Sequence, residues 1–428
     1  MENLFDLFEQ TSGVSIDTRK IKLNCLFICL KGENFDGNQF AEEALLKGAK
    51  YVISDDQANS DKENIYTVED SLIFLQQLAR HHRRKMRAKV IGITGSNGKT
   101  SSKELINCVL SQGFDVLATE GNLNNHIGVP LTLLRLKQHH QIAIIEMGAN
   151  KFKDIEELCA IAEPNYGIIT NIGKAHLEGF INFEGVLKTK TELYHAVSSV
   201  GGTIVFNDDD VVLKNHLPQN VTLYSYGAND SATIQGDLIG MNPYVQFSWK
   251  SGDYSSGTVS THIIGTYNFY NFLSAIAFGK IFGLTEERIN AAISSYIPEN
   301  NRSQVMKTAK NTLILDCYNA NPTSMKSALE SFALIDSPNK FFIIGDMLEL
   351  GAESLHEHQM ILELAAQLNL KGITVGPIFK SLTSSILTNQ FHLTSEAIEF
   401  MNQHPTYDSM ILLKGSRGIG LEKLENSL

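Results

Sequence analysis

The segment that most limits the possible folds of this chain is an apolar run that leads into a glycine-rich turn. Val90–Thr94 forms the run, Gly95-Ser-Asn-Gly98 forms the turn, and a helical pattern follows over Thr100–Gln112. Glycines at a strand-to-helix turn let the backbone approach a polyphosphate, and the free N–H groups of the helix start attract its negative charge. The pattern therefore predicts a nucleotide-phosphate site at the start of this helix.

Two side chains directly after the turn suit such a site. Lys99 would neutralise the terminal phosphates, and the Thr100 hydroxyl would ligate magnesium. The strict spacing G-x-x-x-x-G-K-[ST] is not met, because Ile93 stands where its first glycine belongs. The expected nucleotide-binding residues form one continuous run: Thr94, Gly95, Ser96, Asn97, Gly98, Lys99, Thr100 and Ser101.

Beyond the turn, apolar strands alternate with helical patterns. The sequence predicts buried strands at Val90–Thr94, Ile142–Glu146, Tyr166–Thr170 and Thr203–Phe206. Short apolar strands separated by helices indicate a mainly parallel sheet that is covered on both faces. Residues 221–263 combine short alternating strands with turn residues, which favours added antiparallel structure.

The chain has 428 residues, which is long enough for about three domains. We expect a small α/β domain over 1–84, a central P-loop domain over 85–297 and a Rossmann-like α/β domain over 298–428. A new apolar strand begins at Val90, just after the first boundary, and Pro298 marks the second. The last segment repeats an α/β rhythm, which predicts a smaller doubly wound domain.

Composition narrows the class of protein. The net charge of −11 disfavours general nucleic-acid binding, and the basic cluster Arg80–Lys89 suits either a solvated helix end or a patch for an anionic partner. No apolar run approaches the roughly 20 residues that span a bilayer. The start lacks a signal-peptide pattern, and the five cysteines are few and scattered. We expect a cytoplasmic enzyme without membrane insertion.

Two further residues follow predicted strands of the central sheet. Glu146 ends a buried strand, at the edge where ligands of parallel sheets bind, and its carboxylate suits magnesium. The alternative is a salt-bridged glutamate at a strand end. His176 lies just past another strand. Alone it would be an ordinary core or surface histidine, but beside Glu146 and the phosphate loop we favour a place in the metal shell.

At this point the residues resemble those of the Mur ligase family. Thr94-Gly-Ser-Asn-Gly-Lys-Thr100 is similar to the family's phosphate loop, including its departure from the strict spacing. The resemblance runs in order along nearly the whole chain. Further segments of the central part that resemble the family are Gly121–Pro130, Glu146-Met-Gly, Asn171–Glu178 and the Asn/Asp cluster Asn207–Asp210, which is otherwise a polar turn.

The resemblance assigns an unusual role to one lysine. Lys188-Thr-Lys190-Thr-Glu-Leu-Tyr is similar to the segment that holds a carbamylated lysine in the family. The Glu-Leu-Tyr ending favours Lys190, and Lys188 stays open as the alternative. A carbamate would convert the cation into an anionic oxygen ligand for a second magnesium ion. Without the resemblance, both lysines would be taken as solvated.

Other matching segments concern ATP. Gly265–Asn271 resembles the family's adenine-side motif, although Tyr267 stands where histidine is usual, and Asn271 is the residue we expect to contact the nucleotide. Arg302 and Asp316 match residues that reach back from the last domain to ATP. The alternative for both is a surface charge.

Three segments indicate which member of the family the chain resembles. Asp316–Met325 and Gly345–Gly351, the latter followed by His356, are similar to the member that adds a dipeptide. The sister enzyme's Asp-Asn-Pro-Arg signature is absent from 298–428. In the first domain, Ile16–Arg19, Leu26–Gly32 and Asp36-Gly37 resemble a UDP-sugar-binding pattern, with Asn38 in place of the usual histidine. Lys414–Arg417 resembles the family's closing motif.

The resemblance implies an activity in peptidoglycan synthesis. It is the ATP-dependent ligation of D-alanyl-D-alanine to UDP-N-acetylmuramoyl-tripeptide through an acyl phosphate, by a monomer that uses ATP and two magnesium ions. The implied catalytic residues are Lys99, His176 and Lys190, and the implied metal ligands are Thr100, Glu146, His176 and Lys190. The implied substrate-binding residues are Thr18, Arg19, Asp36, Asn125, Asn319 and Asn321.

Three competing functions stay open at this stage. A sister Mur ligase or a folylpolyglutamate-type ligase would share the nucleotide chemistry and differ in the acceptor. A P-loop ATPase that is not a ligase would hydrolyse ATP without a peptide. A UDP-peptide-binding protein without activity would have no need for Lys99, Thr100, Glu146 and His176.

Overall fold

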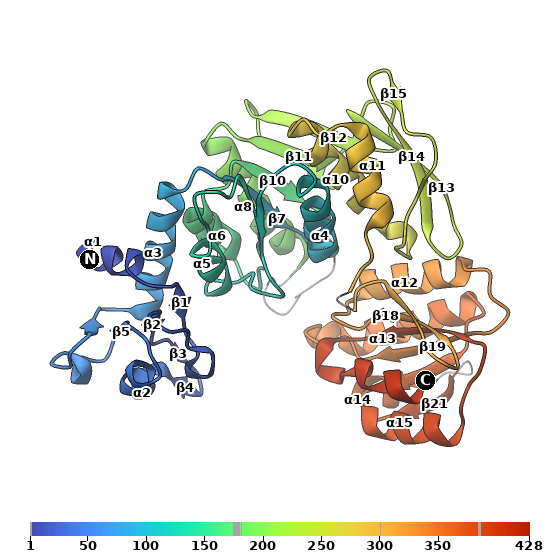
Figure 1. Ribbon diagram of the computed structural model, residues 1–428. Coiled ribbons are helices and arrows are strands. Elements are labelled where there is room, and N and C mark those ends of the chain that lie inside the picture. Colours follow the sequence, from blue (N-terminus) through green and yellow to red (C-terminus); the bar gives the residue numbers. More distant parts are fainter. Residues whose placement is uncertain (1, 174–179, 181, 300, 384–386) are drawn as a thin grey trace.

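The structure is a computed structural model that describes residues 2–173, 180, 182–299, 301–383 and 387–428. Figure 1 shows three groups of elements along an arc, with the first part of the chain and the last part on opposite sides of a central part. Each group is built on its own main sheet, of four, ten and six strands in chain order. The fold is thus mixed α/β with mostly parallel sheets, as the sequence predicts.

The first sheet is parallel, with strand order β1-β2-β5-β6. Its strands are β1 (Val14–Ser15), β2 (Leu26–Ile28), β5 (Tyr51–Ser54) and β6 (Ile65–Thr67), and a hairpin pairs β3 (Lys31–Gly32) with β4 (Phe35–Asp36). The helices are α1 (Glu2–Glu9), α2 (Ala41–Leu46) and α3 (Ser71–Lys85).

The central sheet has the order β15-β14-β13-β12-β11-β10-β7-β9-β8, and β16 pairs with β14. Its strands are β7 (Lys89–Thr94), β8 (Val116–Ala118), β9 (Ile142–Glu146), β10 (Tyr166–Ile169), β11 (Thr203–Asn207), β12 (Thr222–Gly227), β13 (Ile234–Met241), β14 (Val245–Ser251), β15 (Tyr254–Ser255) and β16 (Val259–Ser260). Pairing is parallel from β8 to β13, and antiparallel where β14 meets β13, β15 and β16.

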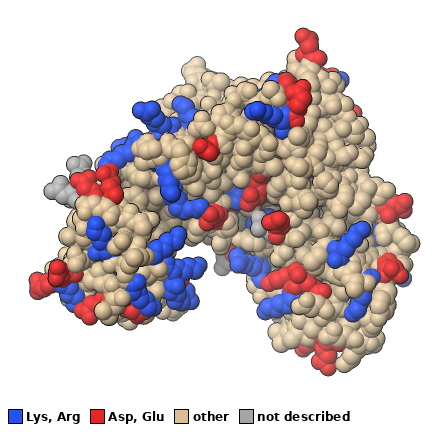
Figure 2. Space-filling view, viewed as in Figure 1, with Lys and Arg blue, Asp and Glu red and all other residues tan. Residues whose placement is uncertain are grey.

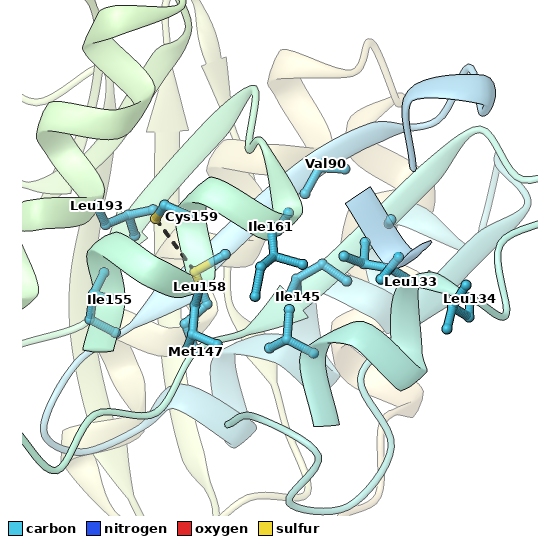
Figure 3. Close-up of a cluster of buried hydrophobic side chains, with 14 of the residues drawn as sticks. Val90, Leu133, Leu134, Ile145, Met147, Ile155, Leu158, Cys159, Ile161 and Leu193 are labelled. Atoms are coloured by element: carbon cyan, nitrogen blue, oxygen red, sulfur yellow. Dashed lines mark hydrogen bonds between the residues drawn. The ribbon is translucent and has the colours of Figure 1, made fainter. Parts of the chain in front are cut away.

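Helices cover both faces of this sheet, and a separate apolar core fills each side. They are α4 (Lys99–Leu110), α5 (Gly128–Leu133), α6 (Asp154–Ala162), α8 (Phe183–Ser199), α9 (Val211–Lys214), α10 (Phe269–Ile281) and α11 (Glu286–Ser295). Figure 3 shows part of one core, in which Met147 follows β9 and its sulfur lies 3.7 Å from the Cys159 sulfur on α6. Side chains buried on both faces explain the uninterrupted apolar strands of the sequence.

The last sheet has the order β17-β18-β22-β19-β20-β21 and is parallel except for β17. Its strands are β17 (Gln304–Lys307), β18 (Thr312–Asp316), β19 (Lys340–Gly345), β20 (Gly372–Val375), β21 (Leu387–Phe391) and β22 (Met410–Lys414). The helices are α12 (Pro322–Leu334), α13 (Ser354–Gln367), α14 (Pro377–Lys380) and α15 (Thr394–Gln403). No helix in the described part of the chain is long and apolar enough to cross a membrane.

The basic cluster at the end of α3 ties the first part of the chain to the central part. Arg80 and Arg84 form ion pairs with Glu163, which follows α6. Arg83 is only 8% exposed, and it donates hydrogen bonds to the Ala162 carbonyl (3.1 Å) and the Asn165 side-chain oxygen (3.2 Å). Much of the cluster therefore has partners within the chain.

Replacing Arg83 with methionine should lower the free energy of unfolding by about 2–3 kcal/mol, because the Ala162 carbonyl loses its Arg83 donor and the Asn165 side chain keeps only its bond from the Val90 N–H. Scanning calorimetry should show a melting midpoint about 5 °C lower. The matched control is Arg87→Met, since Arg87 is exposed near the same helix end. Equal midpoints for the two variants would contradict this prediction.

Candidate active site

A cavity of about 670 Å³ lies between the central and last parts of the chain. Figure 2 shows a recess below the central part with acidic and basic side chains along it. The phosphate loop and α10 form one wall, and the segments after β18 and around α12 form the other. Predicted site residues that line the cavity are Ser96, Asn97, Gly98, Lys99, Thr100, Ser101, Asn125, Glu146, Asn271, Arg302, Asp316, Asn319 and Asn321.

The phosphate loop joins β7 to α4 and requires its two glycines. A Cβ on Gly95 would lie 1.9 Å from the Thr170 hydroxyl oxygen, so no larger residue fits. Gly98 precedes α4 with a φ of 78°, a backbone conformation that L side chains rarely adopt. Thr94 supports the loop from below by donating a hydrogen bond to the Met147 carbonyl. The first N–H groups of α4 are thereby presented at the cavity.

Lys99 lies at the start of α4 and points back over the loop. Its ammonium donates a hydrogen bond of 2.7 Å to the Gly95 carbonyl. Burial lowers the pKa of Lys99, the nearby Arg302 lowers it further, and Glu146 opposes this shift. An anion with several negative charges at this point would favour the charged ammonium.

Glu146 and Thr100 meet beside Lys99, because β9 lies next to β7 and Glu146 pairs with Ile93 in the parallel register. The Glu146 carboxylate is only 2% exposed and accepts hydrogen bonds from the Thr100 hydroxyl and the Asn124 amide, both 2.9 Å long. Both of these donors are neutral groups. A buried carboxylate beside a hydroxyl suits a hard cation such as magnesium.

The two candidate lysines of α8 differ in burial. Lys190 is 2% exposed, whereas Lys188 is exposed to solvent. Burial lowers the pKa of Lys190 well below the usual lysine value, and Lys99 contributes in the same direction. A neutral amine is the form that reacts with carbon dioxide. Burial therefore favours Lys190 over Lys188 as the candidate for carbamylation. The described residues contain no group of three or more His, Cys, Asp and Glu side chains that could hold a metal.

His176 lies outside the described residues, so its predicted place in the metal shell stays a prediction. The Asn207–Asp210 cluster behaves as a polar turn. Asp208 pairs with Lys214 at 2.7 Å, and Asp209 accepts hydrogen bonds from the Ala228 and Asn229 backbone.

Asn271 faces the loop from α10. Its side-chain oxygen accepts a hydrogen bond of 2.9 Å from the Ser102 hydroxyl, and its amide donates to the Asn268 side chain. A Cβ on Gly98 would lie 2.9 Å from the same Asn271 oxygen. The start of α10 and the start of α4 therefore pack directly together at the cavity.

Residues of the last domain complete the cavity. The Asn321 amide donates a hydrogen bond of 2.7 Å to the Asn97 side chain, which joins the two walls. Lys414, at the end of β22, pairs with Asp316 at 2.6 Å, and the Arg302 guanidinium stacks 4.0 Å from the centre of the Tyr318 ring. In the sequence, Lys414 and Tyr318 stand out only as parts of the longer segments that resemble the family, without a role of their own. The feature that could have identified them is their position at or just after the ends of β22 and β18, which are neighbouring parallel strands.

Three predicted substrate residues lie elsewhere, in the first domain. Thr18 and Arg19 begin a short helix after β1, and Arg19 is 85% exposed and pairs with Asp17. Asp36 accepts hydrogen bonds from the Asn38 backbone and side chain. Asn38, which replaces the usual histidine, is buried and also contacts Asp55 and Ser54. None of these residues lines the cavity between the central and last domains.

The geometry is that of a nucleotide-binding protein in which a P-loop domain and a second α/β domain enclose a cavity. Three family models match along the chain: "Mur ligase family, catalytic domain" at residues 10–94, "Mur ligase middle domain" at 93–279 and "Mur ligase, glutamate ligase domain" at 301–417. With curated relatives above 30% identity over nearly its full length, the chain belongs to the Mur ligase family.

Two such relatives are both named UDP-N-acetylmuramoyl-tripeptide–D-alanyl-D-alanine ligase. The Bacillus subtilis protein is 32% identical, with 98% of this chain and 94% of the relative covered. The Escherichia coli protein is 32% identical, with 97% and 93% covered. Among solved structures, MurF from Acinetobacter baumannii has a TM-score of 0.88 at 29% identity, covering 99% of this chain and 97% of that one. MurF ligase from Thermotoga maritima in complex with ADP has a TM-score of 0.88 at 25% identity, with the same coverage.

Proposed function

We propose that this protein uses ATP to join D-alanyl-D-alanine to UDP-N-acetylmuramoyl-tripeptide, forming the pentapeptide, ADP and phosphate. The observation that carries the proposal is the cavity, where the phosphate loop faces the Asp316–Met325 segment across the Asn97–Asn321 hydrogen bond. The names of the curated relatives and the ADP complex of the Thermotoga maritima enzyme support the same activity.

The chemistry follows from the inertness of a carboxylate toward an amine. The terminal carboxylate of the tripeptide takes the γ-phosphoryl group of ATP, and ADP leaves. The amine of the dipeptide then attacks the acyl phosphate, gives up its proton, and expels phosphate as the amide forms. Lys99 and Arg302 would stabilise the charge on the phosphoryl group, so the protein acts by positioning and electrostatics.

Nucleotide orientation would come from both domains. Asn271 would lie on the adenine side, and Asp316, held by Lys414, would accept hydrogen bonds from the ribose. Thr100, Glu146, His176 and a carbamylated Lys190 would hold magnesium, which supplies positive charge to the phosphate oxygens.

In this proposal each of the three parts of the chain binds a different component of the reaction. Residues 1–84 bind the UDP end of the substrate through Thr18, Arg19 and Asp36, residues 85–297 bind ATP, and residues 298–428 close over it. Asn125 would face the peptide, and Asn319 and Asn321 would position the incoming dipeptide. A cytoplasmic monomer without nucleic-acid partners stays our expectation.

The test is phosphate release with ATP, magnesium, UDP-N-acetylmuramoyl-tripeptide and D-alanyl-D-alanine, with each component omitted in turn. The proposal requires release that depends on both the tripeptide and the dipeptide, with a matching mass gain in the product. Release that needs only a single amino acid would indicate a sister ligase. Release without any peptide would indicate a plain ATPase.

Replacing Arg302 with alanine should reduce turnover by about 100-fold or more, because one charged group facing the phosphates is lost. The dissociation constant for the UDP substrate should stay within twofold, since the first domain holds that end. The exposed Arg288 offers the control variant Arg288→Ala in α11. Unchanged turnover in Arg302→Ala would refute closure of the last domain over ATP.

A further inference from the structure

One serine joins the nucleotide side of the central domain to the last domain. Ser303 is 4% exposed, and its hydroxyl lies 2.9 Å from the Tyr267 hydroxyl. The Asn268 amide also donates to it, at 3.3 Å. Tyr267 and Asn268 directly precede α10, the helix whose Asn271 packs against the phosphate loop. The Ser303 side chain is thus held entirely from the central domain.

The Ser303 backbone is in turn bound to the last domain. Its N–H donates to the Asp316 carboxylate at 3.3 Å, and Lys414 pairs with that carboxylate. Ser303 and Asn301 have φ values of 50° and 51°, in the left-handed region. Residues other than glycine stay in this region only where their surroundings hold them there. Arg302 lies between these two residues, so the contacts of Ser303 hold the backbone next to Arg302, whose guanidinium stacks on Tyr318.

Tyr267 is well placed to make this contact. It lines the cavity and is half-buried, and its ring lies so near Gly265 that a Cβ there would be 2.4 Å away. Burial raises the pKa of Tyr267, and the nearby Asp316 adds to this shift. The phenol is therefore protonated at neutral pH and keeps its hydrogen bond to Ser303.

We propose that Tyr267 is a positioning residue for ATP, which acts through Ser303 to hold Arg302 and Asp316 against the nucleotide. The hydrogen bond between Tyr267 and Ser303 would hold the two nucleotide-facing residues in place. Tyr267 stands where the family resemblance leads us to expect histidine. The inference rests on the proposed function, because it concerns the nucleotide of that reaction.

The test compares Tyr267→Phe, Ser303→Ala and the double variant. Each single variant should raise the KM for ATP about 5- to 10-fold, as expected for one hydrogen bond. The KM for the UDP substrate should stay within twofold. The KM for ATP of the double variant should rise no more than that of a single variant, because the two hydroxyls act through the same hydrogen bond. Melting midpoints of all variants confirm that they are folded.

Tyr254→Phe is the matched control. Its hydroxyl accepts a hydrogen bond of 2.8 Å from Asn290 in the same domain, and it does not line the cavity. This variant loses a comparable bond and should leave the KM for ATP unchanged.

Three results would overturn the inference. The first is a KM for ATP in Tyr267→Phe equal to that of the wild type. The second is a KM for ATP in the double variant that rises by the product of the two single-variant increases. The third is a KM for ATP in Ser303→Ala equal to that of the wild type, which would show that the Tyr267 hydroxyl does not act through Ser303. A wild-type protein that makes no ATP-dependent product would instead reject the proposed function, and the two failures are therefore distinguishable.

Discussion

Replacing Lys99 with alanine should reduce turnover by about 1,000-fold. The Lys99 ammonium lies at the start of α4, beside the buried Glu146 carboxylate and facing the Arg302 side of the cavity. No other part of the loop supplies a positive side chain, since its remaining residues are Gly95, Ser96, Asn97 and Gly98. The charge that develops on the transferred phosphoryl group would therefore lose its main partner in the central domain.

The measurement is kcat from phosphate release at saturating substrates, together with the melting midpoint. Lys99 makes hydrogen bonds only within the loop among the described residues, so the fold should survive its removal. Lys326→Ala is the control, because Lys326 is exposed on α12 and outside the cavity. A Lys99→Ala enzyme within tenfold of the wild type would refute the role of this lysine.

Lys190→Ala should also reduce turnover, by about 100-fold or more, whereas Lys188→Ala should stay within twofold of the wild type. The two lysines stand on the same helix two positions apart, and one is buried while the other is exposed. Because burial lowers the pKa of Lys190, its amine is neutral more often and open to carbamylation. Lys188 is therefore a matched control within the same turn of α8.

A second measurement identifies the chemistry at Lys190. If a carbamate is formed there, wild-type activity should fall when bicarbonate and carbon dioxide are removed and return when they are restored. Short carboxylates such as formate or acetate should restore part of the activity of Lys190→Ala, since they supply the missing anionic oxygens. If Lys188→Ala lost activity while Lys190→Ala stayed active, the carbamylated lysine would be Lys188. Wild-type activity that ignores carbon dioxide would rule out the carbamate.

Much of the local structure was predictable because the patterns are strong. The strand predicted over Ile142–Glu146 has the bounds of β9, and the strands predicted over Val90–Thr94 and Thr203–Phe206 differ from β7 and β11 by one residue at one end. Short elements such as β8 and β17 were missed. Two or three turns of apolar periodicity identify a helix, but a strand of three or four residues leaves too few positions to show a pattern.

Part of the site was also accessible from sequence, for a topological reason. Ligands of open parallel sheets bind beyond the carboxyl ends of the strands. The alternation of strands and helices in the sequence therefore predicts that Glu146 and the phosphate loop lie at the same edge of the sheet, and the structure shows that their strands are neighbours in parallel register. The choice between Lys188 and Lys190 was different, since both fit the same motif and only burial separates them.

The sequence by itself determined the class of the fold, the glycine-rich turn before α4 and the family, because these depend on short, contiguous segments with their own backbone requirements. Only the tertiary structure decided how separate segments meet. The Asn97–Asn321, Tyr267–Ser303 and Asp316–Lys414 contacts join residues that are 36 to 224 positions apart in the chain. No local pattern encodes such pairs, because their partners are set by the packing of three sheets and by the way the last domain lies over the central one.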